Sequence, residues 1–376
     1  MKLGKIKIKH YINYAVIGIM TAVLAAIVLT GGRLDNSTLF LLEKMSISII
    51  LAVSLSLVVG FLGELSLGHA GFMCVGAYIG GKAAALLVPT MGNEIGAFLI
   101  SLVIGGVAAA VCGIIIGIPA LRLRGDYLAI VTLAFGEIVK SLFQNSSDES
   151  FGGSLGLSTP RYDKQYLFII GFVLVLVTLF VVQNLMRSKH GRAITAIRDN
   201  EIAARATGTN VTKYKLLAFT LSAMFAGIAG VLYSYSNYTV QSMKFGYNYS
   251  IEILVMVVLG GMGNINGSII AAALITFLNT KLATVLTGDL AVLQNLLYAL
   301  ILIVIVIYNN APALKGIRDK YSIGAFIEKH KKVHDPANIK DDKAKWDVVP
   351  TKISMDEILS VDLVPQDIIY KDGGDK

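Results

Sequence analysis

The chain has 376 residues, of which 55% are hydrophobic and only 15% are charged, and its mean hydropathy is +0.68. Soluble domains carry about 25% charged residues, so this chain has too few polar side chains to cover a water-soluble fold. Two cysteines exclude a disulfide-stapled scaffold and a cysteine-rich zinc site. The sequence also contains no Walker A, dinucleotide-binding, HExxH or GxSxG motif that would indicate an enzyme. The composition therefore predicts a polytopic membrane protein.

Ten apolar segments are candidate membrane spans, because a helix needs about 20 mostly apolar residues to cross roughly 30 Å of hydrocarbon. Two of them are weak: 127–144 carries Glu137 and Lys140, and 251–263 is short, so either is also a candidate for a re-entrant or broken helix. The first segment has a cleaved signal peptide as its alternative interpretation. The ten segments are 11–30, 39–62, 70–88, 95–118, 127–144, 166–185, 214–236, 251–263, 268–287 and 291–309.

Lysine and arginine in the short connecting loops predict the orientation of the spans. Positive charge gathers in 1–10, 119–126 and 186–213, and the alternating loops are poorer in it. Ten crossings of the cell membrane with both termini in the cytoplasm satisfy this pattern. The net charge of +8 is then a topology signal and requires no nucleic-acid partner. Three parts are predicted: a cytoplasmic N-terminus (1–10), a transmembrane domain (11–309) and a polar, disordered or loosely docked cytoplasmic tail (310–376).

Polar residues and glycines interrupt the apolar sequence between the second and third predicted spans. A charged side chain inside the hydrocarbon costs about 2.5–3.5 kcal/mol, so it usually faces a cavity or a partner. Transporters place substrate near glycine-containing breaks in their helices. The break is either a short polar interface loop or part of the translocation path, and Glu64 is expected to brace it rather than touch substrate. The candidate path residues here are Gly63, Glu64, Ser66, Gly68, His69 and Gly71.

A second group of glycines lies late in the chain and contributes the further candidates Gly260, Gly261, Gly263 and Asn264. Residues 58–63 align with 258–263 at an offset of 200, which is explained equally by an internal repeat and by chance. Glu137 is a candidate path residue outside both groups, and its side chain is predicted to point either into the path or toward a membrane face. Other small residues, such as Gly76 and Gly227, are predicted to let helices pack closely.

Residues 187–213 form a positively charged loop in which alanine and isoleucine recur at helical spacing. Asp199 or Asn200 is a candidate cap for a second short helix, which Gly208 would end. The loop is therefore either two short helices that offer an apolar ridge to a soluble partner, or an interfacial amphipathic helix.

Four long runs of sequence carry more information than composition alone. They are GELSLGHAGFMCVGAYIGG, LRLRGDYLAIVTLAFGEIV, GRAITAIRDNEIAARATGTNVTKYKLLAFTLSAMFAGIAGVLYS and SIEILVMVVLGGMGNINGSIIAAAL. Together they resemble the permeases of branched-chain amino-acid ABC importers, in particular the LivM-like family. The resemblance covers about residues 39–309 and leaves out the tail, which is longer than is usual in the family.

The resemblance implies an all-α, type II ABC importer permease fold. Two permease subunits would pair within membrane lipid, two cytoplasmic ATPase subunits would power them, and an extracytoplasmic binding protein would deliver the cargo. ATP would be used by the partner subunits, and no catalytic residue, metal or cofactor is expected on this chain. Branched-chain amino acids are the expected cargo, with urea, amides, nucleosides and simple sugars as alternatives. An ion-coupled secondary transporter that uses Glu64 or Glu137 is the alternative from another class.

The resemblance also bears on individual residues. It favours ATPase coupling as the role of the 186–213 loop, and it places 63–71 and 260–264 beside the translocation path. The residues assigned to coupling are Arg192, Arg198, Asp199, Asn200, Glu201 and Ala204.

Overall fold

Helices make up most of the described chain in this computed structural model. The chain divides into two units, residues 1–307 and 308–376. The described residues are 17–18, 21–22, 35–92, 94–123, 125–160, 164–285, 299–300 and 303, all in the first unit. The predicted tail lies outside the described residues, as do nearly all of the first and last predicted spans. The long helices are α2 (Asn36–Ser56), α3 (His69–Met91), α4 (Glu94–Ala120), α5 (Asp126–Gln144), α7 (Lys164–Arg187), α10 (Val211–Ser236), α11 (Tyr247–Gly260) and α12 (Ile265–Val285).

Six helices in the described part of the chain are long and apolar enough to cross a membrane. They correspond to six of the predicted spans: α2 with the π-helix η2 (Leu57–Leu62), α3, α4, α7, α10 and α12. The two weak segments also form helices. The first is α5, which has 19 residues and carries Asp126, Glu137 and Lys140. The second is α11, which is apolar but has only 14 residues. The total of ten crossings stays a prediction.

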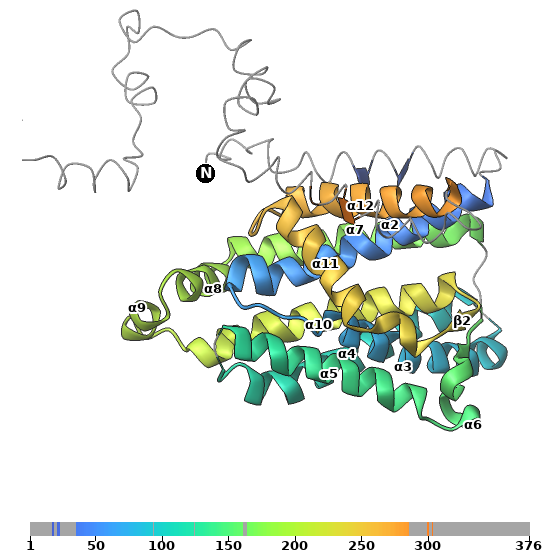
Figure 1. Ribbon diagram of the computed structural model, residues 1–376, viewed down its shortest axis with the longest axis horizontal. Helices are drawn as coiled ribbons and strands as arrows, with labels where there is room; N and C mark the ends of the chain where they lie inside the picture. The colour runs from blue at the N-terminus through green and yellow to red at the C-terminus, as the bar shows by residue number, and fades with distance from the viewer. Residues whose placement is uncertain are drawn as a thin grey trace, which may run out of the picture. The chain divides into compact units, whose positions relative to one another are not determined.

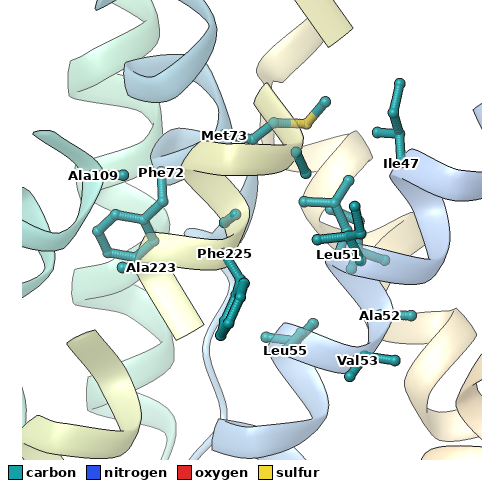
Figure 2. Packing of buried hydrophobic residues seen from close by; sticks show 14 of the residues in the cluster. Ile47, Leu51, Ala52, Val53, Leu55, Phe72, Met73, Ala109, Ala223 and Phe225 are labelled. Atoms are coloured by element: carbon teal, nitrogen blue, oxygen red, sulfur yellow. The ribbon is translucent and has the colours of Figure 1, made fainter. Parts of the chain in front are cut away.

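Small residues allow α3, α4 and α10 to pack closely, as the sequence predicted. A Cβ atom on Gly76 of α3 would overlap the backbone of Gly227 on α10, and one on Gly105 of α4 would lie 3.0 Å from the carbonyl oxygen of Gly76. Larger side chains fill the space beside these contacts. Figure 2 shows Phe72 of α3 between α4 and α10, and its ring meets Phe219 edge-on at 5.5 Å.

Helix α2 is enclosed by its neighbours, whereas α4 and α12 leave apolar faces uncovered in this unit. Leu51 and Leu55 of α2 are fully buried, and Figure 2 shows them beside Phe225 of α10. In contrast, Val103 on α4 is 64% exposed and Ile270 on α12 is 68% exposed. Exposed apolar faces of this kind suit lipid or a second subunit.

The glycine contact between α3 and α10 leads to a direct prediction. Replacing Gly76 with alanine should destabilise the protein by about 1–3 kcal/mol, because a backbone atom and not a movable side chain blocks the added methyl group. The matched control is Gly136→Ala on α5, where the new Cβ would lie at an ordinary 3.6 Å from Gly68 Cα. Thermal unfolding of the purified variants checks this, and equal melting temperatures for the two would contradict it.

The helical unit has two different ends (Figure 1). One end carries α8 (Lys189–Asp199) and α9 (Glu201–Ala206), which connect α7 to α10. The opposite end carries α6 (Asp148–Phe151), the 3-10 helices η3 (Gly153–Leu155) and η4 (Ser242–Phe245), and a small antiparallel sheet. That sheet consists of β1 (Leu157–Ser158) and β2 (Thr239–Val240), with Leu157 opposite Val240 and Ser158 opposite Thr239.

Candidate functional site

The predicted break after the second span is present in the structure. Helix α2 changes into the π-helix η2, and this ends at Gly63, whose φ of +80° is a left-handed conformation that favours glycine. Irregular backbone then leads to His69, the first residue of α3. Single π-helical turns inside longer helices often occur at functional sites. The break is therefore a structural feature and a candidate for function.

Side chains from other helices hold the break in place by satisfying backbone N–H groups near the start of α3. The amide of Leu67 donates to Thr132 Oγ1 of α5 at 3.0 Å, and the amide of Ala70 donates to Ser250 Oγ of α11 at 3.1 Å. His69 is buried, and its Nε2 lies 2.9 Å from Ser54 Oγ of α2. His69 is therefore part of the packing between α2 and α3.

The remaining predicted residues of the break lie against neighbouring helices. Ser66 is only 2% exposed. Gly68 and Gly71 lie against α5: a Cβ on Gly68 would overlap the carbonyl oxygen of Thr132, and one on Gly71 would lie 2.8 Å from Gly136 Cα. The close approach of α5 therefore depends on both glycines.

Glu64 forms an ion pair with Lys215 of α10, and Lys215 Nζ also lies 3.2 Å from Glu201 Oε2 at the start of α9. The exposed fractions of these side chains are 5% for Lys215, 12% for Glu64 and 20% for Glu201. One buried cation thus joins the break, the 186–213 loop and a long helix. Glu64 is thus linked through Lys215 to α10 and α9, and its bracing role stays a prediction.

The loop between α7 and α10 forms two short helices, as one of the two interpretations predicted. Ser188 Oγ accepts from the His190 amide at 3.1 Å to cap α8, and Asn200 Oδ1 accepts from the Ala203 amide at 3.0 Å to cap α9. Ala204 is buried against the unit, whereas Arg192 is exposed. Asp199 is exposed as well, with 66% of its side chain accessible.

Arg198 of α8 joins this loop to both groups of glycines. Its Nη1 donates to the carbonyl oxygen of Gly60 in η2 at 3.2 Å, while Nε and Nη2 donate to Asp199 Oδ1 at 3.0 and 2.8 Å. A Cβ on Gly63 would lie 2.7 Å from Arg198 Cγ, and one on Gly263 would lie 3.6 Å from Arg198 Nη1. We call the region where Gly60, Gly63, Arg198 and Gly263 meet the glycine junction. The sequence predicted Gly63, Arg198 and Gly263 as members of separate groups, and the fold brings them together with Gly60, which was not predicted.

The second group of glycines forms the turn between α11 and α12. Gly261 and Gly263 have φ angles of +89° and +80°, and Asn264 Oδ1 accepts from the Gly267 amide at 3.3 Å to cap α12. Gly260 and Gly267 are in such close contact that neither has room for a Cβ. Asn264 therefore has a capping role in this turn.

Glu137 lies at another place, against the start of α11. Its Oε1 accepts from the Tyr247 amide at 2.9 Å, and its carboxylate forms an ion pair with Lys140. The side chain is 30% exposed. A carboxylate at a helix N-terminus is favourable because it satisfies an N–H group and complements the helix dipole.

A cavity of about 510 Å³, which the sequence did not predict, lies between α2, α10, η4, α11 and α12. Its charged lining residues are Lys44, Lys244 and Glu252. Lys44 and Glu252 are charged residues within apolar segments, and such residues usually face a cavity or a partner. The two residues are 208 positions apart and neither has a glycine break beside it, so the sequence did not connect them. Among the described residues, no group of His, Cys, Asp and Glu side chains could hold a metal ion.

Comparison with known proteins identifies the family. Residues 37–307 match the sequence model of a family described as the permease component of the branched-chain amino acid transport system. The chain belongs to this family. The match covers the helical unit with its break, its two short helices and its glycine turn, so these features belong to a transport permease.

Individual relatives agree with this assignment. The permease is 38% identical over 276 residues to the high-affinity branched-chain amino acid transport system permease protein LivM of Salmonella typhimurium, covering 65% of this chain and 62% of the relative. It is equally similar to LivM of Escherichia coli, over 275 residues. The ribose import permease protein RbsC of Escherichia coli is 27% identical over 299 residues, 73% of this chain and 86% of RbsC. No solved structure matches the permease significantly.

Proposed function

We propose that this permease is the membrane subunit of an ATP-driven importer of branched-chain amino acids in the cell membrane, with both termini in the cytoplasm. A second permease subunit would complete the path, two ATPase subunits would bind at the α8–α9 end, and a binding protein would deliver cargo at the opposite end. The observation that carries the proposal is the glycine junction, where an exposed surface helix is hydrogen-bonded to the candidate path.

Movement of α8 and α9 would reach the path through two connections. Arg198 holds the carbonyl oxygen of Gly60, and Lys215 holds both Glu64 and Glu201. A rigid displacement of α9 therefore acts on the break through Glu201 and Lys215, and a displacement of α8 acts on η2 through Arg198. Both connections end on non-α-helical backbone, which deforms more easily than a packed α-helix.

Transport would proceed by alternating access without covalent chemistry on this chain. ATP binding shifts the equilibrium between two permease conformations only if the closed ATPase pair binds one of them more tightly. The energy for the change then comes from the ATPase subunits, and this chain needs no cofactor of its own. Glu64, Lys215 and Arg198 would transmit the change, while Gly63 and Gly263 supply the turns around which the helices reorient.

The cargo is proposed from the relatives. Branched-chain amino acids are named for the LivM proteins, which match at 38% identity, and ribose for RbsC, which matches at 27%. The chain spans 62% of the length of these LivM relatives. A simple sugar is the second candidate cargo, because RbsC is matched over a larger share of its length.

Reconstitution tests the proposal. The permease is co-expressed with its genomic neighbours, purified as a complex and placed in liposomes with ATP inside. We expect uptake of leucine that requires internal ATP and the binding protein, and that persists when ionophores remove the ion gradients. An ATPase variant lacking hydrolysis is the control. Uptake by the permease alone along an ion gradient would contradict an ATP-driven importer, and uptake of ribose in place of leucine would contradict the cargo.

A further inference from the structure

The cavity lies at the end of the unit far from the coupling helices. It is lined by the first turns of α2, the last turns of α10 and α12, and the start of α11, for example Phe40, Tyr233, Tyr249 and Thr284. Along α10, Tyr233 is about 27 Å from Lys215 at 1.5 Å per residue. The cavity is thus separate from the glycine junction and stands at the end where the proposed binding protein would release cargo.

Charges of both signs meet in this cavity. Lys44, Lys244 and Glu252 all line it, and Lys44 Nζ sits 4.5 Å from the centre of the Phe40 ring. In the part of the chain that the structure describes, neither lysine forms an ion pair with a carboxylate. Charged side chains in a membrane protein usually face a partner or a water-filled cavity. These two lysines therefore offer unpaired positive charge to an anionic group.

Acidic and neutral polar groups also line the cavity. Glu252 is partly buried and its Oε1 accepts from Asn279 Nδ2 at 3.1 Å, which fixes the carboxylate. Thr276 is 6% exposed, and its buried hydroxyl has no hydrogen-bond partner in the described structure. Phe40, Ile47 and Phe245 supply apolar surface beside these groups.

We propose that this cavity binds a zwitterionic α-amino acid with an apolar side chain. The carboxylate would face Lys44 and Lys244, the ammonium group would face Glu252, and the side chain would lie on the apolar wall around Phe40. This inference rests on the proposed function and narrows it, because a neutral sugar has no charged groups to balance those of Lys44, Lys244 and Glu252. At about 510 Å³ the cavity is within the range of small-molecule sites and has room for leucine with some water.

A series of ligands tests the contributions of the ammonium and carboxylate groups of leucine separately. The intact transporter, without its binding protein, is tested with tritiated L-leucine in competition with 4-methylpentanoate, which lacks the ammonium group, and leucinamide, which lacks the carboxylate. For the unmodified transporter we expect each analogue to bind about tenfold or more weakly than leucine, since hydrogen bonds to charged groups are worth about 1.5–3 kcal/mol. Equal binding of all three ligands would overturn the proposal.

Two variants assign the charges to residues. Glu252→Gln should weaken the binding of leucine about tenfold and leave the binding of 4-methylpentanoate unchanged. Lys44→Met should weaken the binding of leucine by a similar factor and leave the binding of leucinamide unchanged. Lys44→Arg keeps the charge and should retain most of the affinity. The matched control is Lys281→Met, an exposed lysine of α12 outside the cavity lining. If a variant loses affinity equally for all ligands, the assignment is contradicted, because a structural defect does not select by ligand charge. A variant that loses no affinity contradicts it as well.

The outcome also separates this inference from the proposed function. If the unmodified transporter takes up leucine with ATP and both variants match the control, the cavity is not the amino-acid site and the importer assignment stands. If the unmodified transporter neither binds nor takes up any branched-chain amino acid, the proposed cargo is wrong, and the zwitterion site falls with it.

Discussion

Replacing Lys215 with methionine should abolish transport and lower the stability of the permease more than any other single change considered. Lys215 is the buried cation between Glu64 and Glu201. Removing one partner of a buried ion pair costs about 3–5 kcal/mol, because the remaining charge stays buried without compensation. Glu201 keeps its ion pair with Arg205 at 2.7 Å, so the main damage falls on Glu64 at the break.

Thermal unfolding and leucine uptake of the reconstituted transporter check this expectation. Lys213→Met, two residues earlier on the same helix and exposed, is the matched control and should change neither measurement. The double variant Glu64→Gln, Lys215→Met should recover part of the lost stability, because neither buried charge then stays unpaired. A single Lys215→Met variant that is as stable as the control would show that the ion pair contributes little.

Replacing Arg198 with alanine should uncouple ATP hydrolysis from transport while membrane insertion stays intact. The change removes the hydrogen bond from α8 to the carbonyl oxygen of Gly60, and with it the contact between the surface helix and the glycine junction. Loss of a hydrogen bond from a charged group is worth about 1.5–3 kcal/mol, so leucine transported per ATP hydrolysed should fall about tenfold or more. Stability should fall less than in Lys215→Met, because Arg198 is 40% exposed and water can replace part of the lost hydrogen bond.

The decisive measurement is the ratio of uptake to ATP hydrolysis in the same liposomes. Lys189→Ala, which removes an exposed charge at the start of α8, is the control. The ratio for Arg198→Lys should lie between those for Arg198→Ala and Lys189→Ala, because lysine keeps the charge but lacks the planar guanidinium group that binds Gly60 and Asp199 at the same time. Full ATP-driven uptake by Arg198→Ala would show that α8 transmits no force through Gly60.

Several features of this permease could be predicted from the sequence because they depend on local patterns. Apolar runs predicted ten spans, six of which are helices of crossing length in the described part of the chain. Gly63 lies at the predicted break, where its left-handed conformation favours glycine. Two short helices were one of the two interpretations of the helical spacing in 186–213, and Asn200, one of the two predicted caps, accepts from the nearby Ala203 amide. In each case the residues that determine the structure lie within a few positions of one another.

The tertiary structure alone decided which of these local features meet. Glu64 and Lys215 are 151 positions apart, and Arg198 and Gly60 are 138 apart, so hydropathy and helical period contain no information on their contact. The cavity is assembled from five helices, α2, α10, η4, α11 and α12, and Lys44 and Glu252 face it only because of how α2 and α11 are rotated. Periodicity determines which residues share one face of a helix, but the face that each helix turns toward its neighbours is set by packing of the whole unit.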